Sequence, residues 1–135
     1  MLRVSPDGKQ LWVQSGAANT NTIVDPESLQ IKETQPTGKG PVTNAWSPDG
    51  KYAMITFGSE TFVAVLDAAT NKELKRIEIG QNASNIGFTP DSKTAYIAVT
   101  GANSVAVIDM ASLTLKTHVT AGKQPQGLIV MEAPT

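Results

Sequence analysis

The sequence "SPDGK" occurs at positions 5–9 and again at 47–51, and a variant, "TPDSK", occurs at 89–93. In Pro-Asp-Gly, proline presets its own φ angle, the aspartate side chain bonds to nearby amides, and glycine accepts the left-handed conformation. Each copy therefore predicts a tight turn. Successive copies lie 42 residues apart, which predicts a repeated structural unit.

The same 42-residue interval relates other positions of the chain. Asp25, Asp67 and Asp109 are spaced in this way, and each is followed three residues later by a serine or threonine. In such a segment the carboxylate accepts hydrogen bonds from amides two or three residues further on. We therefore expect a second repeated turn in every unit.

Each unit is predicted to contain four short strands. In the middle unit they fall at 42–46, 52–57, 62–66 and 73–79, and the third unit has counterparts at 96–99, 105–108 and 115–119. The stretch "FVAVL" at 62–66 is apolar throughout, as expected for a strand that is covered on both faces. A β-sandwich is the alternative, but it does not require strands that are apolar on both faces.

Serial units of four antiparallel strands are typical of β-propeller blades. We therefore predict an all-β fold, a β-propeller segment with three four-stranded antiparallel blades in one domain, residues 1–135. The blades are expected at about 1–37, 41–79 and 83–121, followed by an extra inner strand at 126–131.

The units resemble the YVTN family of β-propeller repeats. The resemblance rests on "SPDGKYAMITFG" and "NSVAVIDMASLTLKTHVTAGKQPQGLIV" and extends over essentially the whole chain. The tetrad that gives the family its name is absent, with "LWVQ", "AMIT" and "YIAV" in its place. The resemblance implies a propeller of about seven blades and a periplasmic or extracellular location. It implies no particular activity.

Three blades are fewer than the four to eight of closed propellers. The outward faces of the first and third blades are therefore expected to expose strand residues, namely Trp12, Val13, Ile23, Ile97 and Val107. One interpretation is a homodimer, in which each copy donates its final strand and two copies close a six-bladed ring. The alternative is a C-terminal fragment of a larger extracytoplasmic propeller protein or propeller enzyme whose active site lies elsewhere.

A binding surface is predicted on one rim of the propeller. The loops between the second and third strands, and those between successive units, differ from copy to copy, whereas the turns on the opposite rim repeat. Variable loops on a fixed scaffold are a common way for repeat proteins to bind partners. The predicted partner is a protein, a peptide or a glycan, and the candidate residues are Lys39, Asn44, Gln81, Asn82, Asn85, Lys123 and Gln124 near the axis and Asn19, Asn21, Glu60 and Asn103 further out.

Signals for other functions are weak. The net charge is −1 and no basic stripe is present, which argues against nucleic-acid binding. No apolar run is long enough for a membrane span. The chain has no cysteine and a single histidine, His118, expected on an outer strand, so no metal or cofactor site and no catalytic residue is predicted. We therefore expect a binding or scaffold module rather than an enzyme.

Overall fold

The computed structural model describes residues 1–132, which form three antiparallel sheets of four strands each. The first blade contains β1 (Leu2–Val4), β2 (Leu11–Ser15), β3 (Thr20–Val24) and β4 (Ile31–Pro36). The second contains β5 (Pro41–Trp46), β6 (Tyr52–Phe57), β7 (Phe62–Asp67) and β8 (Glu73–Glu78). The third contains β9 (Ala83–Phe88), β10 (Thr94–Val99), β11 (Ser104–Asp109) and β12 (Thr114–Thr120). The predicted all-β architecture is confirmed.

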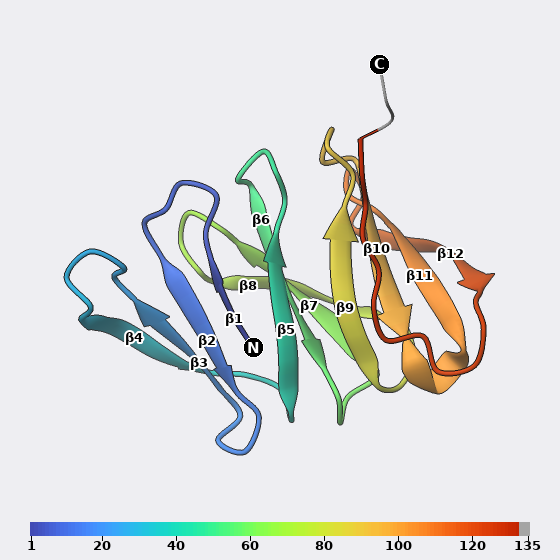
Figure 1. Cartoon of the computed structure of the whole chain (residues 1–135), viewed down its shortest axis with the longest axis horizontal. Coiled ribbons are helices and arrows are strands. Elements are labelled where there is room, and N and C mark those ends of the chain that lie inside the picture. Colours follow the sequence, from blue (N-terminus) through green and yellow to red (C-terminus); the bar gives the residue numbers. More distant parts are fainter. Residues whose placement is uncertain (133–135) are drawn as a thin grey trace.

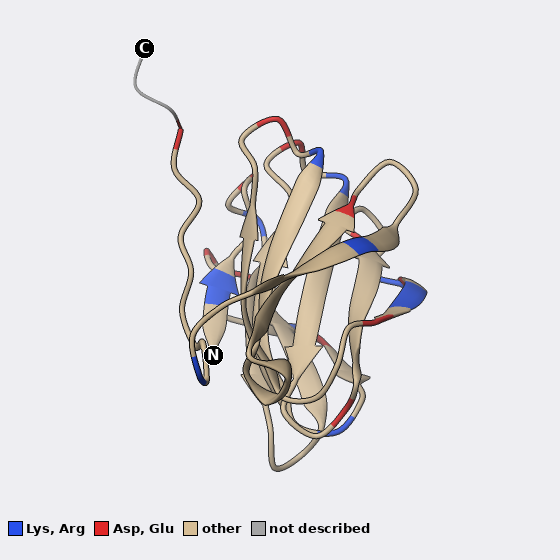
Figure 2. Ribbon diagram, turned by 90° about the vertical axis from the view of Figure 1, so that its right-hand side faces the viewer, with Lys and Arg blue, Asp and Glu red and all other residues tan. Residues whose placement is uncertain are grey.

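The blades stand side by side, with the first strand of each toward the same centre (Figure 1). Strands within a blade follow the order of the sequence, so β4, β8 and β12 are the outer strands. One turn of 3₁₀ helix, Thr100–Ala102, is the only helical element in the described chain. Among residues 1–132, no helix has the length and apolar character needed to cross a membrane. Charged residues lie mainly on the turns and outer strands (Figure 2).

The repeated turns form as predicted, and their hydrogen bonds recur in every copy. The hydroxyls of Ser5, Ser47 and Thr89 donate to the aspartate two residues on, at 2.6, 2.7 and 2.6 Å. In the third copy Ser92 replaces glycine and takes the same left-handed conformation, with φ at 60°. Its hydroxyl accepts a hydrogen bond of 2.9 Å from the amide of Asp49. The residue that departs from the motif therefore links the second blade to the third.

These turns lower the pKa of their carboxyl groups. The Ser47 hydroxyl, and then the amide of Lys51, hold the pKa of Asp49 below its ordinary value. The Ser112 hydroxyl has the same effect on the pKa of Asp109. Because the pKa is lower in the folded than in the unfolded chain, the associated stabilisation is present at neutral pH and is lost as the pH falls through the folded pKa.

Replacing Ser47 by Ala is expected to raise the pKa of Asp49 toward its ordinary value, because the largest cause of the shift is removed. Carboxyl titration followed by NMR measures this directly. The matched control is Ser47→Thr, which installs the residue found in the third copy and should keep the pKa low. The pKa of Asp109 should not move in either variant. An unchanged Asp49 pKa in Ser47→Ala would contradict this account of the turn.

Two apolar clusters fill the spaces between the blades. Trp12 and Ile23 of the first blade pack against the second blade, which contributes Ala53, Ile55, Phe57, Phe62, Ala64 and Leu66. The other cluster joins the second and third blades and includes Met54, Val63, Ile77, Ile86 and Ile97. Strand β7 is buried along most of its length because it lies between these clusters, as its apolar sequence predicted.

The prediction that strand residues of the outward faces are exposed was wrong for four of its five residues. Trp12, Ile23 and Ile97 are at most 1% exposed, because their side chains turn toward the second blade. Val107 is only 9% exposed. Val13 is half-buried. The register places Val13 opposite Leu2, and these two share the outward face of the first blade with Val4, Leu11, Val24 and Ile31.

The predicted extra strand at 126–131 is not a strand among the described residues. The segment runs beside β9 instead (Figure 1). Leu128 and Val130 lie so close to Gly87 that a Cβ atom there would meet them at 2.5 and 2.9 Å. Ser84 donates a hydrogen bond of 2.9 Å to the carbonyl of residue 126. The segment therefore covers part of the third blade's outward face without a strand pairing of its own.

Candidate functional site

Loops on one rim are held together by a backbone hydrogen bond that recurs in each blade. The loop between the second and third strands supplies the acceptor, and the loop that leaves the fourth strand supplies the donor. The amides of Thr37, Ile79 and Ala121 donate to the carbonyls of Asn19, Thr61 and Asn103, each at 2.9 Å. A single scaffold therefore fixes loops whose sequences differ.

Two of the predicted rim residues take part in this scaffold. Asn19 and Asn103 have φ angles of 55° and 49°, and their Oδ1 atoms accept hydrogen bonds from the amides of Gly40 and Gln124 at 2.8 and 2.9 Å. Asparagine tolerates the left-handed conformation better than most residues. Their side chains therefore hold the loops in place.

The predicted site residues separate into three groups by exposure. Lys39, Gln81, Asn82, Asn103, Lys123 and Gln124 are exposed, and Asn19, Glu60 and Asn85 are half-buried. Asn21 and Asn44 are fully buried between the first and second blades. Their placement on the rim was therefore wrong, because strand alternation turns both side chains into the interface.

A hollow on this rim brings three predicted residues together. Glu60, Gln81 and Asn82 line it with Gly58, Ser59 and Thr61, and it encloses about 330 Å³. Glu60 also accepts a hydrogen bond of 3.0 Å from the amide of Lys39. We call this feature the rim hollow. Its lining is polar, and Gln81 and Asn82 are exposed there.

Sequence analysis missed a cluster of buried amides. Gln14, 6% exposed, donates from Nε2 to Asn21 Oδ1 at 2.9 Å, and its Oε1 accepts a hydrogen bond from Asn44. Asn21 Nδ2 and Asn44 Oδ1 have no partner in the described chain. A signal was present in the repeat, because Asn44 occupies a position that is aliphatic, Leu2, Ile86 and Leu128, in the other units.

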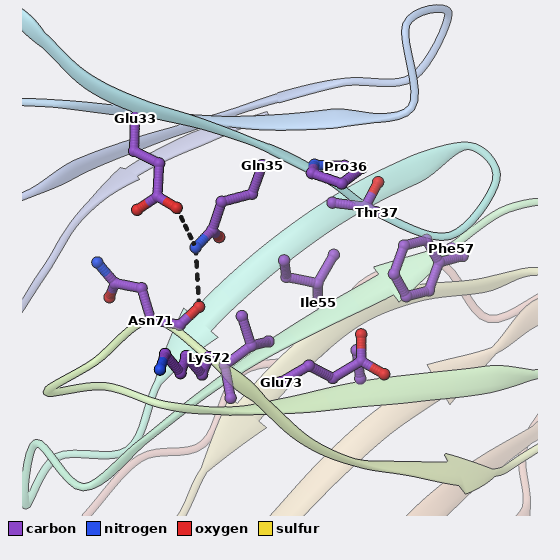
Figure 3. A pocket seen from close by; sticks show the side chains of 11 residues that line it. Glu33, Gln35, Pro36, Thr37, Ile55, Phe57, Asn71, Lys72 and Glu73 are labelled. Carbon is purple, nitrogen blue, oxygen red and sulfur yellow. Dashed lines mark hydrogen bonds between the residues drawn. The ribbon is translucent and has the colours of Figure 1, made fainter.

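Sequence analysis also missed a cleft between the first two blades, which we call the interblade cleft (Figure 3). Its volume is about 290 Å³. The floor is formed by side chains of β6 and β7, namely Ile55, Phe57, Ala64 and Leu66. The mouth is mostly polar, with residues of β4, the segment after it, the turn between β7 and β8 and the start of β8: Glu33, Gln35, Pro36, Thr37, Asn71, Lys72 and Glu73.

Hydrogen bonds at the mouth use the side-chain amide of Gln35 and leave one buried acceptor without a partner. Gln35 Nε2 donates to Glu33 Oε1 at 3.2 Å and to the carbonyl of Asn71 at 2.9 Å. The buried Oδ1 atom of Asn71 has no donor among the described residues. In Figure 3 the amine end of Lys72 lies on the Asn71 side of the cleft, away from Phe57.

No cluster typical of a metal site occurs in residues 1–132, where no three or more histidine, cysteine or acidic residues are suitably grouped. His118 lies on the outer strand β12, as predicted. Its Nε2 atom is 2.8 Å from the carbonyl oxygen of Ile79, so the ring connects the third blade to the second. This contact gives His118 a structural role at the interface of the two blades.

No family model matches the chain. No curated protein matches it either.

Many solved structures are similar to it. One is hydrazine synthase of Kuenenia stuttgartiensis, which is 28% identical, with a TM-score of 0.86 over 93% of this chain and 36% of that one. Another is a putative 6-phosphogluconolactonase of Bacteroides fragilis, 20% identical, with a TM-score of 0.77 over 91% of this chain and 39% of that one. The WD40 repeats of RRP9 are 17% identical, with a TM-score of 0.80 over 89% of this chain and 38% of that one.

The chain spans less than two fifths of each of these structures. They include enzymes and WD40 repeats, so the likeness concerns architecture and not one activity. The sheet order, the apolar clusters between sheets and these likenesses agree. The chain has a β-propeller fold, with its three four-stranded antiparallel sheets as blades.

Proposed function

We propose that the chain is a non-catalytic binding module that recognises a protein, peptide or glycan through the rim hollow. The observation that carries the proposal is the convergence of Glu60, Gln81 and Asn82 on one polar hollow over a fixed loop scaffold. Amide and carboxylate groups of this kind suit hydroxyl-rich or backbone-like ligands, which offer many donors and acceptors. Its position on variable loops of a repeated scaffold also supports a binding role.

The test is a binding screen of the purified chain against glycan and peptide arrays. We expect saturable binding that falls about tenfold or more in a Gln81→Ala, Asn82→Gly double variant, which removes two hydrogen-bonding side chains. Glycine suits position 82 because Asn82 has a φ of 60°. Lys51→Ala, on a turn at the opposite rim, is the control. Absence of any ligand, or equal losses in both variants, would refute the proposal.

A second candidate is that the chain is part of a longer propeller whose activity lies elsewhere. The short span that it covers in the similar solved chains favours this reading, and two of those proteins carry enzyme names. The outward face of the first blade, with Leu2 61%, Val4 51% and Ile31 67% exposed, needs a neighbour in either case. We propose that a second copy or further blades cover it, and the mass in solution distinguishes the two.

A further inference from the structure

The first strands of the blades place one repeat position around a common pocket. Positions 3, 45, 87 and 129 are separated by 42 residues and hold Arg3, Ala45, Gly87 and Ile129. All four residues line a pocket of about 390 Å³, which we call the axial pocket. It lies among β1, β5, β9 and the segment 126–131, so three blades and the segment after them build it together.

The walls of the axial pocket are apolar and include two aromatic rings. Trp46 and Phe88, both half-buried, supply these rings. Leu128 and Val130 approach closely at Gly87, since a Cβ atom there would meet them at 2.5 and 2.9 Å. Aromatic rings attract other rings in tilted or offset arrangements, so these walls favour a ligand with an aromatic body.

Arg3 is the only charged residue that lines the axial pocket in the described chain. The register of β1 and β2 pairs Arg3 with Trp12, so both side chains are on the face of the first blade that packs against the second. The two ion pairs formed within residues 1–132 do not involve Arg3. The pocket therefore offers one half-buried guanidinium that no carboxylate of this part of the chain neutralises.

The nearest aspartate in the sequence does not change this balance. Asp49 follows Pro48, which lines the axial pocket, but Asp49 itself lines a different hollow. Its carboxylate accepts hydrogen bonds from the Ser47 hydroxyl at 2.7 Å and from the amide of Lys51 at 3.0 Å. The charge that faces the axial pocket is therefore the single positive charge of Arg3.

This lining discriminates between classes of ligand. A sugar needs several hydrogen-bonding groups, and among the lining side chains only the Arg3 guanidinium and the Trp46 indole have one. One guanidinium matches one carboxylate, with two parallel hydrogen bonds between them. A volume of this size lies within the range of pockets that enclose small organic ligands.

We propose that the axial pocket binds a monocarboxylate with an aromatic body. The carboxylate pairs with the Arg3 guanidinium, and the ring lies beside Trp46 and Phe88. This site goes beyond the proposed function, because the axial pocket shares no lining residue with the rim hollow or with the interblade cleft.

The test is an NMR titration of the isotope-labelled full chain with 3-phenylpropionate. We expect saturable shift changes at the Trp46 indole and at the amides of Ala45 and Gly87. The uncharged 3-phenylpropanamide has the same body and should bind about tenfold or more weakly, because it lacks the charge that pairs with Arg3. Equal binding of the acid and the amide, or an absence of shifts at these three residues, would overturn the proposal.

Acetate is the probe for an adventitious ion, since it has the carboxylate without the ring. We expect it to bind about tenfold or more weakly than 3-phenylpropionate, because it buries almost no apolar surface. Acetate binding as tight as that of 3-phenylpropionate would mean an adventitious ion only, and would overturn the proposal.

Matched variants test the charge. Arg3→Gln should weaken 3-phenylpropionate about tenfold and leave 3-phenylpropanamide nearly unchanged, since only the acid uses the guanidinium charge. Lys116→Gln removes the same charge from an exposed position on β12 and should affect neither probe. Equal losses of acid and amide in Arg3→Gln would mean a structural role for Arg3, and equal losses in both variants would mean a non-specific charge effect. Either result would overturn the proposal.

Phe88→Leu tests the ring, because leucine keeps an apolar side chain at this position without the aromatic face. It should weaken both aromatic probes about threefold or more. Unchanged binding of both probes would overturn the aromatic part of the proposal. None of these variants alters a residue of the rim hollow, so binding at the two sites can be lost separately.

Discussion

Replacing Gln14 by Thr, Asn21 by Val and Asn44 by Ile together is expected to raise the free energy of unfolding by about 2–4 kcal/mol. These are the residues of the next unit, Thr56, Val63 and Ile86, at the equivalent positions. The gain has two sources. The substitutions remove two buried polar atoms that have no hydrogen-bond partner and whose burial is therefore unfavourable. They also place apolar groups in an interface that excludes water. Urea unfolding at neutral pH measures the change.

The single variant Asn44→Ile is the matched control. It removes the hydrogen bond that Asn44 donates to Gln14 and leaves the Gln14 Oε1 atom without that donor. We expect it to be neutral or to lower stability by about 1–3 kcal/mol, in contrast to the triple variant. A triple variant less stable than the natural chain would mean that the amide cluster stabilises the first interface.

Trp12→Ala is expected to lower the free energy of unfolding by about 3–5 kcal/mol. Trp12 is fully buried, its ring centre lies 4.8 Å from that of Trp46, and its Nε1 donates to Gln10 Oε1 at 2.9 Å. Truncation therefore removes the largest buried side chain of the first interface and leaves a cavity. Urea unfolding followed by the fluorescence of Trp46 measures the loss.

Two further variants test whether the loss of stability follows the size and burial of the side chain that is removed. Trp12→Met installs the residue of the second unit, Met54, and should cost less than the alanine change because methionine fills irregular space. Trp46→Ala should also cost less, since Trp46 is only partly buried. A loss below about 1 kcal/mol for Trp12→Ala would show that the first blade contributes little to the folded state.

The turns and strands of this chain could be predicted because local chemistry determines them. Pro-Asp-Gly and Asp-x-x-Ser/Thr specify backbone angles and hydrogen bonds within a few residues, and the observed β6, Tyr52–Phe57, has the predicted bounds. Because the units are spaced by 42 residues, the strands predicted for one unit could be placed at the equivalent positions of the others.

The direction of side chains was harder to predict. Alternation along β2 and β3 groups Trp12 with Gln14, but it does not say whether this group faces solvent or the second blade. In the structure this group faces the second blade. Trp12 and Ile23 are therefore buried instead of exposed, and Asn21 and Asn44 are buried in the interface instead of lying on the rim. The departure of Asn44 from the aliphatic pattern was visible in the sequence, but its burial was not.

The interblade cleft could not be predicted from motifs, because its residues come from two blades and contain no local signal. Gln35 and Asn71 are ordinary polar residues of an outer strand and a turn when taken alone. Their contribution to the cleft is recognised only by comparison with the aliphatic residues, Ile77 and Leu113, that occupy the same positions in the next unit. A comparison of the units at interface positions, in place of turn positions, would have found the difference.

The gapless repeat has a consequence for inheritance. Both intervals between successive Pro-Asp turns are 42 residues long, so a crossover between the coding sequences of two turns inserts or deletes one whole repeat in frame. Each remaining turn keeps its serine or threonine, aspartate and left-handed residue, and only the two newly joined faces must fit. The mismatch between polar and aliphatic interfaces then becomes the main restriction on which blades can be neighbours in a recombined gene.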